Sequence, residues 1–290
     1  MANVKEYKRK LKSLVNTRKI TKTMKMVAAS KLRKAYEAQA NAKLYAKNLT
    51  NLISRISASV ESTVNPLLKV HATNTRALIV VFTSDTGLCG AFNHNANNHV
   101  VHWIQKNKSS YNKIDLSFCG RRGHMFFHKR ANVKIYYKDV TAHPKFSNAE
   151  IIGNDLQKSF LSDEYDEVYL AYNQFFSPLS QKTIFEKVLP IDPKALISDE
   201  KAIKSVEYIF EPASAKLLEF LIPHFLYFKI YFALLENSAG EHGARMSAMD
   251  NATKNATELI NRYTLLRNRA RQAQITIELT EIVGGAEALN

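Results

Sequence analysis

The sequence predicts an α/β fold in which long N- and C-terminal helices pair as an antiparallel coiled coil around a central, Rossmann-like α/β domain with a mainly parallel sheet. Residues 1–65 contain neither glycine nor proline. Apolar residues repeat at heptad spacing at both ends, and short apolar runs alternate with helix-length stretches in between. We therefore expect an N-terminal helix over residues 1–65, the α/β domain over 66–212 and a C-terminal helix over 213–290.

The N-terminal segment is rich in Lys, Ala, Leu and Met, which favour helix. From residue 28 onward its apolar positions alternate steps of four and three with a single polar break. The seam consists of Ala28, Leu32, Ala35, Gln39, Ala42, Ala46, Leu49, Ile53, Ile56 and Val60. This alternation is typical of a coiled-coil helix.

The C-terminal segment repeats the pattern. Its seam consists of Met249, Ala252, Ala256, Leu259, Tyr263, Leu266, Ala270, Ala273 and Ile277. We expect this helix to begin as early as Ala213, with a bend or weak place at Pro223 or at Gly240 and Gly243. A helix of about 58 residues is about 85 Å long, whereas a 150-residue domain has a radius of gyration near 15 Å. The helices should therefore protrude from the domain and pack against each other.

The middle of the chain predicts strands at 76–82, 113–120, 133–137, 166–172, 183–191 and 206–210, and helices at 91–108 and 148–161. The stretch SDTGLCGAFN at 84–93 follows the first strand, where a parallel sheet binds ligands. It lacks the lysine of a phosphate-binding loop, and it does not contain the Gly-x-Gly-x-x-Gly pattern of a dinucleotide fingerprint. We interpret it as a strand-to-helix turn that needs permissive backbone.

The heptad pattern fails at one place in the N-terminal helix. Continuing it from Val4 to Ala28 puts polar residues on the seam, namely Arg18, Thr21 and Lys25. The apolar residues Ile20, Met24 and Val27 then turn to another face. Either this face contacts a partner or the supercoil changes locally.

The charge is concentrated in one segment. The chain carries a net charge of +15, and residues 1–60 hold fifteen Lys and Arg against Glu6 and Glu37, a balance of +13. Such a basic arm is typical of binding to nucleic acid, an anionic membrane surface or an acidic protein. The two cysteines predict no disulfide framework. We expect no signal peptide and no transmembrane segment, because no uninterrupted apolar stretch is long enough.

Several ordered motifs together resemble one family. They are NTRKITKTMKMVAASK at 16–31, SDTGLCGAFN at 84–93, YIFEP at 208–212, EHGARMSAMDNATKNA at 241–256 and NRARQAQITIELTEIVGGAEAL at 268–289. The chain is similar over its whole length to the gamma subunit of F-type ATP synthases, the central rotor shaft.

The resemblance implies a non-catalytic subunit of a rotary motor that couples ion transport to ATP synthesis or hydrolysis. Its coiled coil would fill a hexamer of alpha and beta subunits, and its α/β domain would contact the epsilon subunit and the membrane c-subunit ring. Catalysis would lie on beta, so no cofactor and no small-molecule substrate are expected. The protein would be peripheral to the cytoplasmic face of the inner membrane.

The resemblance also implies site residues. Met24, Arg271 and Gln272 match positions that contact beta, and Thr276, Glu278 and Glu281 match positions linked to coupling. Tyr208 and Glu211 resemble residues that meet the ring and epsilon.

Two other classes of protein fit the sequence less well. A nucleic-acid-binding coiled coil would favour interleaved exposed aromatics, but residues 1–60 have only Tyr7, Tyr36 and Tyr45. An enzyme using Asp85 and the histidines would need a catalytic motif, and no His-Asp-Ser or His-Glu-x-x-His pattern occurs. We therefore expect no nucleic-acid partner and no active site.

Overall fold

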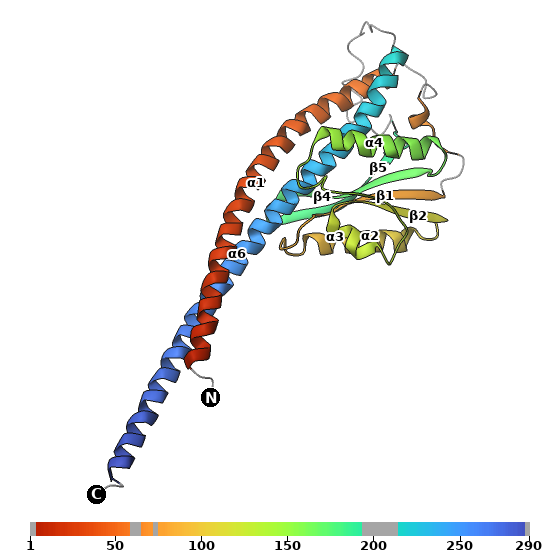
Figure 1. Ribbon diagram of the computed structural model, residues 1–290. Helices are drawn as coiled ribbons and strands as arrows, with labels where there is room; N and C mark the ends of the chain where they lie inside the picture. The colour runs from red at the N-terminus through yellow and green to blue at the C-terminus, as the bar shows by residue number, and fades with distance from the viewer. Residues whose placement is uncertain (1–3, 59–64, 72–74, 193–213, 288–290) are drawn as a thin grey trace. The chain divides into compact units, whose positions relative to one another are not determined.

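A computed structural model describes residues 4–58, 65–71, 75–192 and 214–287 (Figure 1). The chain divides into two compact units, one of residues 29–244 and one that combines residues 1–28 with 245–290. Two long helices, α1 (Val4–Ala58) and α6 (Ser214–Glu287), each contribute to both units. We describe each unit by itself.

The larger unit is built on a five-stranded sheet. Its strands are β1 (Arg76–Phe82), β2 (Lys113–Cys119), β3 (Val133–Tyr137), β4 (Glu167–Ser177) and β5 (Ser180–Leu189). They lie in the order β3-β2-β1-β4-β5, and all neighbours are parallel except the β4–β5 hairpin. This confirms the mainly parallel sheet that the apolar runs predict. The run at 206–210 lies outside the described residues.

Helices cover both faces of this sheet (Figure 1). On one face α2 (Phe92–Asn107) and α3 (Arg121–Phe127) pack on Ile79 and Val81. On the other, α4 (Phe146–Leu161) and the long helices pack on Leu78, Val80 and Phe82, and a short 3-10 helix, η1 (Pro66–Leu68), joins the same core. The alternation along β1 arises because successive strand side chains point to opposite faces.

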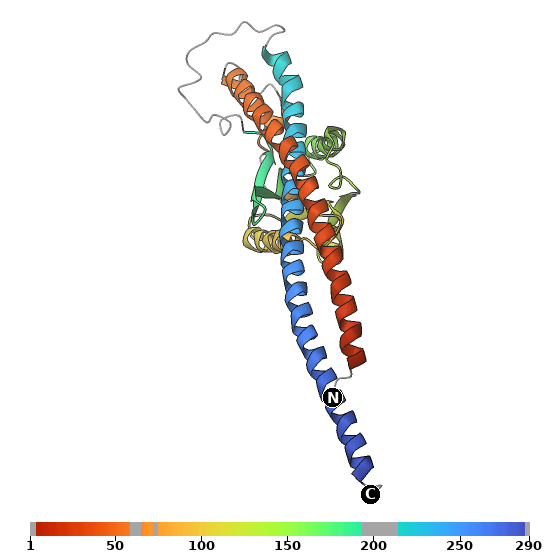
Figure 2. The ribbon, with the colours of Figure 1, turned by 90° about the vertical axis from the view of Figure 1, so that its left-hand side faces the viewer.

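Within the larger unit α1 and α6 are antiparallel and side by side, as Figure 2 shows from a second direction. Tyr45 of α1 contacts Phe228 of α6, and Gln39 contacts Glu236. The predicted α1 seam is confirmed, because each of its described members from Leu32 to Ile56 is buried or half-buried. Val60 lies outside the described residues.

Helix α6 begins at Ser214, next to the expected start, and continues through Pro223 without interruption. Within the part of the chain that the structure describes, one helical segment, Lys216–Ala286, is long and apolar enough to cross a membrane by length and composition alone. The sequence itself offers no uninterrupted apolar stretch of the roughly 18 to 20 residues needed to span a bilayer. The apolar side chains of this helix include Leu218, Ile222 and Leu226, which belong to the core of the larger unit.

The smaller unit pairs the first part of α1 with the last part of α6, again antiparallel. Tyr7 packs on Tyr263 with ring centroids 6.1 Å apart, and Thr21 bonds Thr253. The C-terminal seam is buried or half-buried as far as Ala270, except for Leu259. From residue 271 to 286 every α6 side chain is exposed, because α1 begins only at Val4.

Candidate functional site on the paired helices

Polar residues occupy the α1 seam where the heptad pattern fails. Thr21 is buried and accepts a 2.8 Å hydrogen bond from the Thr253 hydroxyl. Lys25 Nζ lies 2.6 Å from Asp250 Oδ1, and Lys254 contacts the other carboxylate oxygen at 3.3 Å. The hydrogen bonds from Lys25 and Lys254 lower the pKa of Asp250. Thr21 and Lys25 therefore face α6, as the seam predicts, and their bonds define the register of the two helices.

The apolar residues of the same segment turn away from α6. Ile20 is 60% exposed and Val27 is 52% exposed, while Met24 between them is half-buried. Met26 is exposed too, although the sequence pattern did not single it out. Contiguous exposed apolar side chains on a helix surrounded by lysines are typical of a docking surface.

The expected contact residues on α6 are all exposed. Arg271 and Gln272 lie just beyond the paired part of the helix, followed by Thr276, Glu278 and Glu281. The Thr276 hydroxyl donates to the Gln272 carbonyl oxygen at 3.0 Å, and Gln274 Nε2 donates to Glu278 Oε1 at 2.9 Å. These bonds stay within one helix, so the side chains can reach a partner.

The structure does not bring Met24 and Arg271 together. Neighbouring Lys25 pairs with Asp250, which is 21 residues before Arg271 and so about 30 Å away along the helix. The paired helices thus offer two separate contact regions. The other two expected site residues, Tyr208 and Glu211, lie outside the described residues.

The last turns of α6 also expose apolar side chains. These are Ile275, Ile277, Leu279, Ile282 and Val283. In the described part of the chain no other segment covers them, since the partner helix begins at Val4 near Tyr263. Large apolar side chains around a single helix are typical of a surface that a partner buries.

The turn after β1 is held by bonds within the larger unit. Ser84 N donates to Asn93 Oδ1 at 2.9 Å, and Asp85 accepts bonds from Arg121 N at 3.0 Å and from the Thr141 hydroxyl at 2.7 Å. Leu88 and Gly90 have positive φ values of 63° and 59°, which the tight turn requires. These contacts support the interpretation of this stretch as a structural turn, with Asp85 joining β1 to α3.

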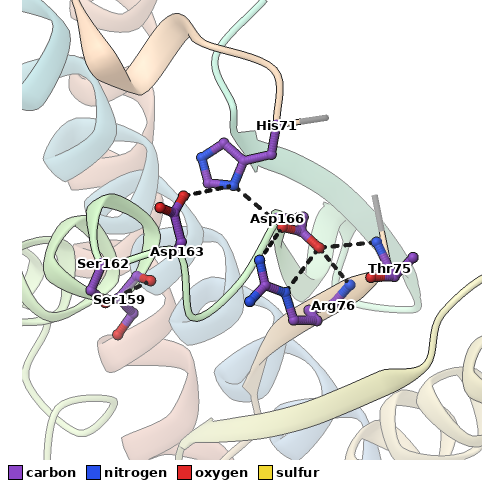
Figure 3. A network of polar contacts seen from close by, with 7 residues as sticks. All are labelled: His71, Thr75, Arg76, Ser159, Ser162, Asp163 and Asp166. Carbon is purple, nitrogen blue, oxygen red and sulfur yellow. Dashed lines mark hydrogen bonds and ion pairs between the residues drawn. The ribbon is translucent and has the colours of Figure 1, made fainter. Parts of the chain in front are cut away.

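A second polar network lies at the other end of β1 (Figure 3). The buried Asp166 carboxylate accepts bonds from Arg76 Nη2 at 2.6 Å, from Thr75 N at 3.0 Å and from Arg76 N at 2.9 Å. His71 Nδ1 lies 3.3 Å away. Burial raises the pKa of Asp166, but these hydrogen bonds outweigh it and hold the pKa well below its usual value. The network joins the residues before β1 to the start of β4.

No catalytic grouping emerges from these contacts. Among the described residues no three His, Cys, Asp or Glu side chains are grouped so that they could hold a metal ion. Burial raises the pKa of the Cys119 thiol, which disfavours the reactive thiolate. The features most typical of function are therefore the exposed surfaces of the smaller unit.

Comparisons with known proteins agree with the resemblance. A family model described as ATP synthase matches residues 3–289. The chain is 43% identical to the ATP synthase gamma chain of Geobacter sp. (strain M21), over 100% of this chain and 99% of that one. It is 42% identical to the gamma chain of Pelotomaculum thermopropionicum, over the full length of both.

Solved structures are also similar. A chain of the central stalk and c-ring of the Tetrahymena thermophila mitochondrial ATP synthase matches with a TM-score of 0.57 at 25% identity, over 80% of this chain and 99% of that one. A chain from the Euglena gracilis mitochondrial ATP synthase matches with a TM-score of 0.66 at 20% identity, over 99% and 94%. The second likeness supports the fold alone.

Proposed function

The chain belongs to the ATP synthase gamma-chain family, and on that premise we propose that it is the rotating shaft of an F-type ATP synthase. In this role it transmits the rotation of the membrane ring to the catalytic beta subunits, during ATP synthesis or hydrolysis. Its partners are the alpha and beta subunits, the epsilon subunit and the c-subunit ring.

One observation carries this proposal: from residue 271 to 286 α6 is a single exposed helix that displays apolar side chains on its surface. An isolated helix of this kind is poorly stable in water and prone to association. A ring of subunits that encloses it would bury these side chains while leaving the helix free to turn.

The mechanism follows from symmetry. A single shaft inside a threefold ring cannot touch three equivalent subunits alike, so each catalytic site is held in a different conformation. Rotation then takes the three sites through these conformations in turn. The shaft acts through differences in contact energy among the sites, and it carries no reacting group itself.

The electrostatic surface supports an acidic protein partner. Exposed cations on the smaller unit include Lys8, Arg9 and Lys12 of α1 and Arg262 and Arg269 of α6. Complementary charge steers association and selects partners more than it adds affinity. Acidic loops of beta suit this surface and account for the basic segment without nucleic acid.

We assign the contacts as follows. Met24, Arg271 and Gln272 touch beta, and the planar guanidinium of Arg271 suits a carboxylate. Thr276, Glu278 and Glu281 act in coupling. Tyr208 and Glu211 meet the ring and epsilon.

The chain has three segments in this proposal, which form a shaft and a foot. Residues 1–65 and 213–290 form the shaft, and residues 66–212 form the foot. The foot contacts the membrane ring from the cytoplasmic face of the inner membrane, so the subunit is peripheral.

Reconstitution tests the proposal. We expect the chain to form a complex with matching alpha and beta subunits in a ratio of one to three to three. Arg271→Ala and Gln272→Ala should each lower ATP hydrolysis, because a single bond to a charged partner contributes about 1.5–3 kcal/mol, or roughly 10- to 150-fold in rate.

Glu258→Ala is the matched control, since this exposed charged residue lies on the same helix, outside both the cationic surface and the assigned contacts. Unchanged turnover in the Arg271 and Gln272 variants would remove these two residues from the contact. A chain that never joins the hexamer, and instead binds nucleic acid with steep salt dependence, would overturn the proposed function.

A further inference from the structure

Helix α6 buries two consecutive polar residues against the sheet of the larger unit. Glu236 and Asn237 are 3% and 0% exposed. Burial of a carboxylate and an amide is costly unless both are hydrogen-bonded. Their hydrogen-bond partners therefore identify the segments to which this part of the helix is fixed.

Glu236 joins three segments of the chain. Its Oε1 accepts a bond from Gln39 Nε2 of α1 at 2.7 Å, and its Oε2 accepts one from the Phe175 backbone N–H of β4, also at 2.7 Å. Both donors are neutral, so the carboxylate is fixed by directed bonds and not by an ion pair. Hydrogen bonds to a charged group are roughly twice as strong as neutral ones.

Asn237 reaches the end of a different strand. Its Nδ2 donates to the carbonyl oxygen of Thr83, the residue that follows β1, at 3.2 Å. The Thr83 hydroxyl in turn accepts a bond from Gly123 N at 2.9 Å. This point is the carboxyl edge of the parallel sheet beside the β1–β4 boundary, where open α/β sheets bind ligands. In this chain, helix α6 lies at that edge of the sheet.

Two glycines bring the helix close enough for these bonds. A Cβ at Gly240 would lie 3.0 Å from Phe92, and one at Gly243 would lie 3.0 Å from Phe175 and 3.1 Å from the Pro178 backbone. The side chains of Phe92 and Phe175 therefore fill the space that a longer residue would need. The sequence interpretation of these glycines as a soft place did not anticipate this packing.

We propose that Glu236 and Asn237 form a torque anchor, the buried contact through which the sheet of the foot turns α6. The bonds point to α1, to the β4–β5 hairpin and to the end of β1, so rotation of α6 against the sheet in either sense breaks at least one of them. Other bonds from α6 to the sheet domain are less sheltered, such as Tyr227 to Asn154. The inference rests on the proposed function as a rotating shaft.

A reciprocal exchange of the two side chains tests the anchor. Gln39→Glu sets a second carboxylate against Glu236 and removes its donor. The double variant Gln39→Glu/Glu236→Gln restores both bonds, because the new amide can donate to the new carboxylate and still accept from Phe175 N–H. Gln39→Leu removes the donor without adding charge and serves where Gln39→Glu does not assemble. Tyr227→Phe is the matched control, since it deletes one bond from α6 to α4.

The variants are measured in the whole synthase, in membrane vesicles. Hydrogen exchange of the Phe175 amide reports the anchor directly, and we expect about tenfold faster exchange in the single variants. The ratio of ATP-driven ion pumping to ATP hydrolysis reports torque transfer. It should fall in the single variants, return in the double variant and stay unchanged in Tyr227→Phe.

The two readouts separate the anchor from general stability. Faster Phe175 exchange with an unchanged pumping-to-hydrolysis ratio would overturn the inference. The hydrogen bonds of the anchor would then be weakened without any effect on torque transfer. A fall in the ratio that the double variant does not reverse would also overturn it. If the wild-type chain fails to join the hexamer, the proposed function itself is wrong.

Discussion

At the scale of single residues, buried charges are satisfied by several directed bonds each. The Asp166 carboxylate accepts hydrogen bonds from the Arg76 guanidinium and from two backbone N–H groups. The Glu236 carboxylate accepts them from one side-chain amide and one backbone N–H. Removal of a partner from such a group leaves a buried charge without compensation, which is costly. These residues therefore control how firmly neighbouring segments are joined.

The Asp166 network predicts a specific loss of stability in acid. The pKa of this carboxyl is lower in the folded chain than in the unfolded chain, where it is about 3.9. Its ionised form thus stabilises the fold above about pH 4, and the contribution is lost as the pH falls toward the folded-state pKa. Asp166→Asn should cost about 2 kcal/mol at neutral pH and flatten the acid dependence of unfolding.

Denaturant unfolding between pH 2 and pH 7 checks this prediction. Asp163→Asn is the control, because Asp163 is exposed and lies 3.6 Å from His71. A surface pair of this kind contributes about 0–1 kcal/mol. If Asp166→Asn and wild type lost stability in parallel between pH 5 and pH 2, Asp166 would not be the responsible group.

At the scale of elements, the two long helices differ along their lengths in what they pack against. In the larger unit α1, α4 and the sheet surround α6, and the apolar side chains of this helix pack against them. In the smaller unit it has α1 alone, and beyond Ala270 it has no described neighbour. The same helix therefore changes from a core element to an exposed one.

Glycines on α6 should respond differently to alanine in these two settings. Gly243→Ala gains about 1 kcal/mol of helix propensity, but its Cβ meets the Pro178 backbone, and overpacking costs about 1–3 kcal/mol. We expect a net loss of stability, seen as a lower Tm. Gly284→Ala meets nothing within 4 Å and should not lower the Tm. A Gly243→Ala variant as stable as wild type would show that the hairpin yields.

The end of α6 gives a second prediction for an element. Deletion of residues 282–290 removes Ile282 and Val283, which are exposed and need a covering partner. We expect coupling between ATP hydrolysis and ion pumping to weaken without being abolished, because the contacts proposed for Arg271 and Gln272 remain. Pumping at the full wild-type rate by the truncated subunit would show that the tip is dispensable.

At the scale of the whole molecule, the sequence predicts most elements because their periodicity is long or their strands are strongly apolar. The α1 seam from Ala28 to Ile56 and all five described strands are confirmed. The α6 seam is confirmed as far as Ala270 except at Leu259, and its last members, Ala273 and Ile277, are exposed. Helix α3 was not predicted, since RRGHMFF is too short to show a helical period and contains a glycine. The antiparallel direction of β5 was also not assigned, because strand direction depends on the two-residue connection to β4.

For the site, the sequence identified the exposed faces and tertiary structure supplied the buried contacts. The turn of Ile20 and Val27 away from the seam follows from heptad spacing alone. No spacing rule finds Glu236, whose two donors come from residues 197 and 61 positions away in the chain. A carboxylate on a helix is normally solvated, and only its neighbours in space decide otherwise.

The sequence by itself determined the long helices, the strands, the basic segment and the family, because these depend on composition, local periodicity and contiguous motifs. Only the tertiary structure decided that Gly240 and Gly243 admit two aromatic rings. It alone decided that α6 occupies the ligand-binding edge of the sheet and that Glu236 joins three segments. These outcomes depend on contacts between residues far apart in the chain, which the fold creates and local sequence does not encode.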